Sequence, residues 1–218
     1  IAGLHGKEAS TAEFHAGRVA VRPGLPMIAV ATTSGTGSEV TVNGVISDRA
    51  RRVKVSIRGE GLMPWAAVVD PELTVPCPAA VTASAGMDAL CQAIESYASI
   101  HATAVTEALS VRAVEEIVAS LETAVRDGSC REARTQMAEG SLMAGMALGN
   151  ARLGVIHGLV HPLGVRYEIP HGLACGVMLP AALRYNRAAM GAKYERLRSL
   201  MGGADPAEFC SELLDRVG

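Results

Sequence analysis

The change in hydrophobic periodicity near Pro78 is the feature that most limits what this chain can fold into. Up to about Asp70 the apolar runs are short and are separated by glycine, proline and charged residues. Segment 26–32 (PMIAVAT) is typical of a buried strand, and segment 66–70 (AAVVD) is typical of another short strand. Two further apolar segments flank Asp48, Arg49 and Ala50, and they predict a hairpin or a pair of extended segments.

From about Pro78 onward the pattern is helical. Segment 105–125 (VTEALSVRAVEEIVASLETAV) collects most of its large apolar residues near one face, and the pair Asp127-Gly128 is expected to end that helix. Segment 132–151 (EARTQMAEGSLMAGMALGNA) is rich in alanine and methionine and weakly charged in its second half, which predicts a buried helix.

The two halves therefore predict an α+β, multi-domain chain. Residues 1–76 are expected to form part of an α/β domain, and residues 77–218 a helical domain. The first part is too small for a complete parallel sheet, which needs more strands and helices on both faces. Either a partner supplies the rest or the chain is a fragment.

Composition excludes several classes of protein. Apolar residues make up 49% of the 218 residues and aromatic residues only 3%, so a large aliphatic core is expected. The net charge of −2 gives no basic surface for nucleic acid, and no apolar run is long enough for a membrane span. The five scattered cysteines form no CxxC pair, which favours a reduced, cytoplasmic protein.

Three of the six histidines lie within fifteen residues: His157, His161 and His171. His157 and His161 are four residues apart and share a helix face, and Pro162 places them near a helix end or kink. His171 lies between Pro170 and a glycine, at an expected helix start. Buried imidazoles need partners for both nitrogens, and a metal ion is one such partner. Spacing alone leaves a metal site and ordinary structural roles equally open, with Asp88 as the candidate carboxylate.

Segment 32–41 (TTSGTGSEVT) follows a predicted strand, which is a usual place for phosphate or nucleotide contacts. Its small hydroxyl residues and two glycines allow a ligand to approach the backbone closely. The segment lacks the lysine of a Walker A loop and the third glycine of GxGxxG, so a plain turn is an equally good interpretation.

Together these motifs resemble the iron-containing (group III) alcohol dehydrogenase family. The matching stretches are TTSGTGSEVT, VVDPELT, GMDALCQAIESY, NARLGVIHGLVHPLG and IPHGLACGVMLP, in that order, and they span about residues 26–186. The resemblance implies a Rossmann-like domain followed by a helical metal-binding domain, as in dehydroquinate synthase. It also implies hydride transfer between a small alcohol or aldehyde and NAD or NADP, with iron or zinc in the cleft and a homodimer as the assembly.

The resemblance also assigns roles to residues. The metal carboxylate falls on Asp88 and two histidine ligands fall on His157 and His171, whereas His161 matches a histidine used in proton transfer. The positions that match cofactor contacts are Thr32, Thr33, Thr36, Thr41, Asn43 and Lys54.

Two departures from the family pattern stand out. The family's glycine-serine phosphate loop has no counterpart, which implies an incomplete chain. The family's other histidine ligand falls on Gln92, whose neutral amide oxygen is a weak donor to a transition metal. The site is therefore expected to keep three protein ligands, as catalytic zinc does, or to use Gln92 weakly, or to hold no metal. Cys91 points elsewhere on the helix and is interpreted as a buried core thiol.

Two alternative functions stay open. One is a maleylacetate reductase-like enzyme, which shares the architecture. The other is an inactive fragment or pseudoenzyme that binds only metal or a partner subunit.

Overall fold

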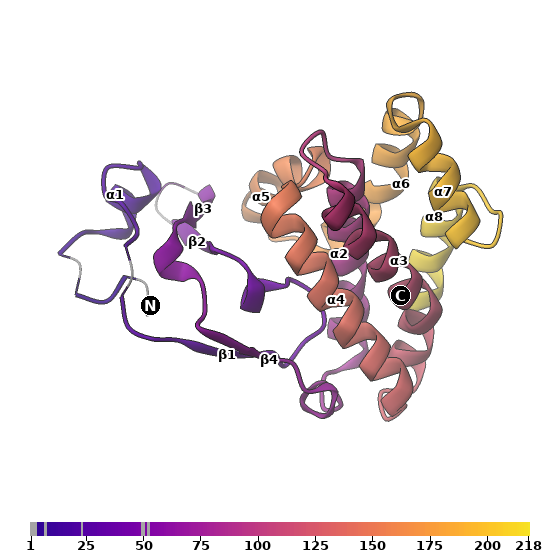
Figure 1. The fold of residues 1–218 in the computed structure, drawn as a ribbon, viewed down its shortest axis with the longest axis horizontal. Coiled ribbons are helices and arrows are strands. Elements are labelled where there is room, and N and C mark those ends of the chain that lie inside the picture. Colours follow the sequence, from indigo (N-terminus) through magenta and orange to yellow (C-terminus); the bar gives the residue numbers. More distant parts are fainter. Residues whose placement is uncertain (1–3, 7, 23, 49–50, 52) are drawn as a thin grey trace.

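The computed structural model describes residues 4–6, 8–22, 24–48, 51 and 53–218. Figure 1 shows the two parts side by side, an extended region with short strands and a bundle of long helices. The change near Pro78 is where the first long helix begins, at Ala79. This arrangement confirms the predicted fold class, a small α/β part followed by a helical part.

The N-terminal part contains two separate pairs of strands. Strand β1 (Ile28–Val30) pairs in parallel with β4 (Ala66–Val68), and β2 (Asn43–Asp48) pairs antiparallel with β3 (Val53–Arg58). The second pair matches the predicted hairpin, although residues 49, 50 and 52 of its connection lie outside the described residues. Short helical segments complete this part: α1 (Thr11–His15), η2 (Ser38–Val40), η3 (Glu60–Leu62) and η4 (Pro71–Thr74).

The buried strand predicted for residues 26–32 is corrected by the structure. The strand is limited to Ile28–Val30, and the side chains of Ile28 and Val30 are 67% and 52% exposed. Among the described strands β1 pairs only with β4, so its apolar side chains have no second layer to pack against.

The C-terminal part is helical. Its elements are α2 (Ala79–Ala98), α3 (Ala104–Arg126), α4 (Arg131–Ala151), α5 (Val155–Tyr167), α6 (His171–Met190), α7 (Ala192–Leu200) and α8 (Pro206–Val217). Helix α2 lies at the centre and packs against α3, α4 and α6, so every residue from Gly86 to Tyr97 is buried. Its polar side chains are therefore buried as well, among them Asp88, Gln92 and Glu95.

Helix ends follow the sequence signals closely, with one exception. Helix α3 begins with a reciprocal capping box between Thr103 and Thr106, and its C-terminal cap is Asp127, as predicted. Helix α6 begins at His171, also as predicted. Of the two alternatives at Pro162, a helix end or a kink, the helix end is excluded, because α5 continues to Tyr167 with the proline inside it.

Two glycines allow close approaches that position the functional residues. Gly37, in the left-handed region with φ +58°, lies against Gly145 of α4, and a Cβ atom on Gly37 would approach the Gly145 Cα to 2.4 Å. This contact fixes the hydroxyl-rich loop on the helical part. A Cβ atom on Gly172 would lie 2.0 Å from the carbonyl oxygen of Ser84, so the start of α6 packs directly on α2.

Within the described ranges, no helix has the length and apolar character needed to cross a membrane.

Candidate metal centre

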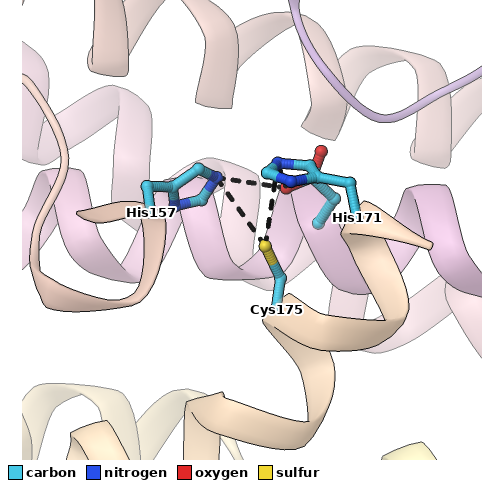
Figure 2. A group of neighbouring side chains, drawn as sticks. His157, His171 and Cys175 are labelled. Carbon is cyan, nitrogen blue, oxygen red and sulfur yellow. Dashed lines mark hydrogen bonds and ion pairs between the residues drawn. The ribbon is translucent and has the colours of Figure 1, made fainter. Parts of the chain in front are cut away.

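Four side chains from three helices meet in one cluster near the start of α6. Asp88 lies on α2, His157 on the first turn of α5, and His171 and Cys175 on successive turns of α6. The His157 Nε2 atom is 3.2 Å from Asp88 Oδ1 and the His171 Nε2 atom is 3.6 Å from it. The Cys175 Sγ atom is 3.9 Å from His157 Nε2 and 3.8 Å from His171 Nε2. Figure 2 shows both imidazoles and the thiol pointing toward one another.

Glu95 holds His157 from the other side. Its carboxylate lies 2.6 Å from His157 Nδ1, and it accepts hydrogen bonds from the backbone amides of Ile156 at 2.7 Å and His157 at 3.4 Å. A carboxylate only accepts hydrogen bonds, so His157 Nδ1 donates to Glu95, while Nε2 faces Asp88 and the rest of the cluster. The same carboxylate caps the N-terminus of α5, where Gly154 offers no side chain.

The electrostatics of the cluster favour positive charge beside Asp88. Burial opposes ionisation of Asp88, but the hydrogen bond from His157 and the charges of His157 and His171 hold the pKa of its carboxyl below the usual value. Burial also disfavours the charged form of His157, yet its hydrogen bonds to Asp88, Cys175 and Glu95 raise its pKa to about 12. The protein therefore places anionic groups around the two histidines, an environment that favours a cation.

The thiol of Cys175 is also tuned by its neighbours. A hydrogen bond from Cys91 is the largest effect, and together with those from His157 and His171 it outweighs burial and lowers the pKa of Cys175 to about 5. Burial raises the pKa of Cys91, which lies completely within the core. The expectation that Cys91 is a buried core thiol is confirmed.

His161 lies at the edge of the cluster. Its ring centroid is 5.2 Å from that of His171. Burial, together with the charges of His171 and Lys54, lowers the pKa of His161 to about 4. The ring is therefore neutral near pH 7.

A cleft of about 500 Å³ opens in front of the cluster. One side is lined by Asp88, Gln92, His157, His161 and His171, which belong to the helical part. The other side is lined by four of the predicted cofactor positions: Thr36, Thr41, Asn43 and Lys54. The remaining two lie elsewhere, because Thr32 is exposed and Thr33 lines a smaller cavity with Asp70 and Ser141.

Gln92 faces the same cleft, one turn after Asp88 on α2. Its side chain is 3% exposed, and its Oε1 atom has no hydrogen-bond partner among the described residues. An unpaired buried carbonyl oxygen is costly and marks a place where a ligand, water or cation supplies the missing partner.

The residues present fit a divalent metal ion. Carboxylate, imidazole and thiolate are the donors that zinc and similar transition metals use, and all four donor atoms lie within 4.8 Å of one another. Sequence reasoning missed Glu95 and Cys175. The helical spacing could have indicated both residues. Glu95 follows Asp88 by seven residues and Cys175 follows His171 by four, so each shares a helix face with a predicted ligand.

A buried carboxylate–imidazole centre at a cleft between a hydroxyl-rich loop and a helical bundle defines a metal- and cofactor-binding class of protein. The model of the iron-containing alcohol dehydrogenases matches residues 1–71, and that of the Fe-containing alcohol dehydrogenase family, C-terminal part, matches residues 82–218. The chain belongs to the iron-containing alcohol dehydrogenase family.

Relatives support this membership. The 1,3-propanediol dehydrogenase of Klebsiella pneumoniae is 44% identical over 177 residues, which are 81% of this chain and 46% of that protein. The NAD-dependent methanol dehydrogenase of Bacillus methanolicus is 41% identical over 181 residues, which are 83% of this chain and 48% of that protein. The chain thus spans about half the length of these curated relatives.

The fold is shared with solved structures as well. The sulfoacetaldehyde reductase of Bifidobacterium kashiwanohense, solved in complex with NAD⁺, superposes with a TM-score of 0.92 and 35% identity, covering 100% of this chain and 59% of that one.

Proposed function

We propose that this chain carries the metal and cofactor cleft of an NAD(P)-dependent alcohol dehydrogenase or aldehyde reductase. One observation carries the proposal. Asp88, His157 and His171 line one side of the cleft, while Thr36, Thr41 and Asn43 line the other. Hydride transfer requires the cofactor ring and a polarised substrate oxygen to meet in one cavity, and this cleft brings the two sets of residues together.

Asp88, His157 and His171 would hold the metal, and Glu95 would fix the orientation of His157. A bound divalent ion supplies Lewis-acid polarisation of an alcohol or carbonyl oxygen. The loop hydroxyls of Thr36 and Thr41 and the amide of Asn43 would orient the dinucleotide, and Lys54 would offer it a positive charge.

His161 would move the proton. It lies in the cleft beside His171, and its neutral ring is able to accept the proton that an alcohol loses and pass it to solvent. The proton-transfer role rather than a ligand role is supported by its place at the edge of the cluster.

The substrate class is small alcohols and aldehydes, as the names of the relatives suggest.

We also propose domains at residues 1–76 and 77–218, because η4 ends at Thr74 and α2 begins at Ala79. A cytoplasmic homodimer completes the proposal. It is supported by the five free cysteines and by the exposed apolar side chains of Ile28, Val30 and Val68.

The experiment is a titration of the zinc-loaded and iron-loaded chain with NADH and NADPH, followed by fluorescence, together with oxidation of 1,3-propanediol. We expect cofactor binding and turnover. His157→Ala should abolish metal binding, whereas His161→Asn should keep the metal and lose turnover. His5→Ala is the matched control, because His5 is exposed and lies outside the cluster. Metal binding without any NAD(P)H binding would contradict the proposal and favour a metal-binding fragment.

A further inference from the structure

Cys175 lies where a fourth metal ligand would lie. Its side chain is 0% exposed, and it stands one helical turn after His171 on α6. Its Sγ atom is almost equally far from the Nε2 atoms of His157 and His171, at 3.9 and 3.8 Å. Figure 2 shows the thiol directed at the space between the two rings.

The distances fit the edges of a coordination tetrahedron. Zinc–nitrogen and zinc–oxygen bonds of about 2.1 Å place neighbouring donor atoms about 3.4 Å apart, and a zinc–sulfur bond of about 2.3 Å places sulfur about 3.6 Å from nitrogen. The observed separations from Asp88 Oδ1 to the two histidines are 3.2 and 3.6 Å, and those from Cys175 to the same histidines are 3.9 and 3.8 Å. These four edges differ from the ideal values by a few tenths of an ångström, and all six donor–donor separations lie within 4.8 Å.

Cys175 and Gln92 approach the cluster from different sides. Gln92 lines the cleft, whereas Cys175 is completely buried behind the histidines. A thiolate is a far stronger donor to zinc than a neutral amide oxygen. With Asp88 it also supplies two negative charges, which balance a divalent ion.

We propose that the thiolate of Cys175 is the fourth protein ligand of the metal, so that the donor set is Asp88, His157, His171 and Cys175. The inference rests on the proposed function, because it concerns the same metal. When the metal binds, the thiol proton of Cys175 leaves to solvent and a sulfur–metal bond forms. The soft donor selects zinc or cobalt over iron, and Gln92 stays free to accept a hydrogen bond from a hydroxyl group in the cleft.

The test uses Co²⁺ as a spectroscopic probe of the whole chain. We expect one near-ultraviolet thiolate-to-cobalt charge-transfer band in the unaltered protein. Cys175→Ser should remove this band and weaken Co²⁺ binding by roughly a hundredfold, since even indirect partners of metal ligands contribute about tenfold to a hundredfold. Cys91→Ser is the matched control, because Cys91 is equally buried and neighbours Cys175 but does not belong to the cluster. It should keep the band.

A second measurement needs no variant. X-ray absorption of the zinc-loaded chain should show one sulfur at about 2.3 Å from the metal. Bound metal with no sulfur neighbour, or a band that survives Cys175→Ser and disappears in Cys91→Ser, would overturn the assignment and leave the proposed function intact. Failure of the chain to bind any metal would overturn both.

Discussion

Replacing Glu95 by glutamine tests how much the orientation of His157 contributes to metal binding, because the substitution leaves His157 itself in place. In the structure one carboxylate serves three donors, the His157 ring and the amides of Ile156 and His157. Glutamine keeps one carbonyl oxygen for the amides and presents its NH₂ group to His157 Nδ1. Two donors then face each other, so Nδ1 has to give up its hydrogen, and the remaining hydrogen lies on Nε2, the atom that faces Asp88.

The magnitude follows from the contacts. Hydrogen bonds to charged groups contribute about 1.5–3 kcal/mol each, and Glu95 is only 7% exposed, so solvent screens them little. Losing the ring contact and the charge at the start of α5 should lower the free energy of unfolding by about 2–4 kcal/mol. The affinity for Zn²⁺ should fall about tenfold to a hundredfold, as for other partners of metal-binding histidines.

Urea denaturation of the metal-free protein measures the first effect, and competition for Zn²⁺ with a chromophoric chelator measures the second. Glu115→Gln on α3 provides a control, because Glu115 is partly exposed and its ion pairs with arginine among the described residues are long, at 3.5 Å. If Glu95→Gln binds Zn²⁺ as tightly as the unaltered chain, the carboxylate does not set the hydrogen position of His157 and the reasoning is wrong.

Three further predictions follow from separate contacts. Gln92→His should tighten Zn²⁺ binding, because an imidazole would add a strong donor on the cleft side, and an unchanged dissociation constant would show that position 92 does not face the metal. Gly172→Ala should lower the free energy of unfolding by about 1–3 kcal/mol in urea denaturation, since the new Cβ atom would lie 2.0 Å from a carbonyl oxygen of α2. Gly158→Ala, with nothing within 4 Å, should be neutral or stabilising, and equal losses in the two variants would contradict the packing argument. Asp205→Ala should cost about 1–2 kcal/mol at pH 7, because Asp205 caps α8. Burial opposes ionisation of Asp205, but the Tyr194 hydroxyl and the α8 amides hold its pKa below the usual value, so this stabilisation is present above about pH 4 and is lost as the pH falls through the lowered pKa. A difference that persists unchanged at pH 2 would refute the charge-based explanation.

The helical part was largely predictable because each helix carries its own signals. Apolar spacing placed α3 and α4, and the Asp127-Gly128 pair and Pro170 marked an end and a start correctly. Burial of a strand was not predictable in the same way. Segment 26–32 has a buried strand's composition, but whether Ile28 is covered depends on neighbouring elements, which local pattern does not specify.

The candidate metal centre was also only partly predictable from local sequence pattern. Spacing pairs residues on one helix, such as His171 with Cys175, but it does not show which helices meet. The meeting of α2 and α6 depends on the missing side chain of Gly172, and that of α2 and α5 on the reach of Glu95 beside Gly154. The motifs named Asp88, His157 and His171, yet only the three-dimensional arrangement brought Cys175 behind them and left Gln92 in the cleft.

The most direct test of the central claim is the metal content of the chain after purification in buffer containing zinc and iron, measured by elemental analysis. The account predicts about one equivalent of divalent metal per chain, lost when Asp88 and His157 are both replaced by alanine. A chain that carries no metal while its circular dichroism shows the native helical content would contradict it.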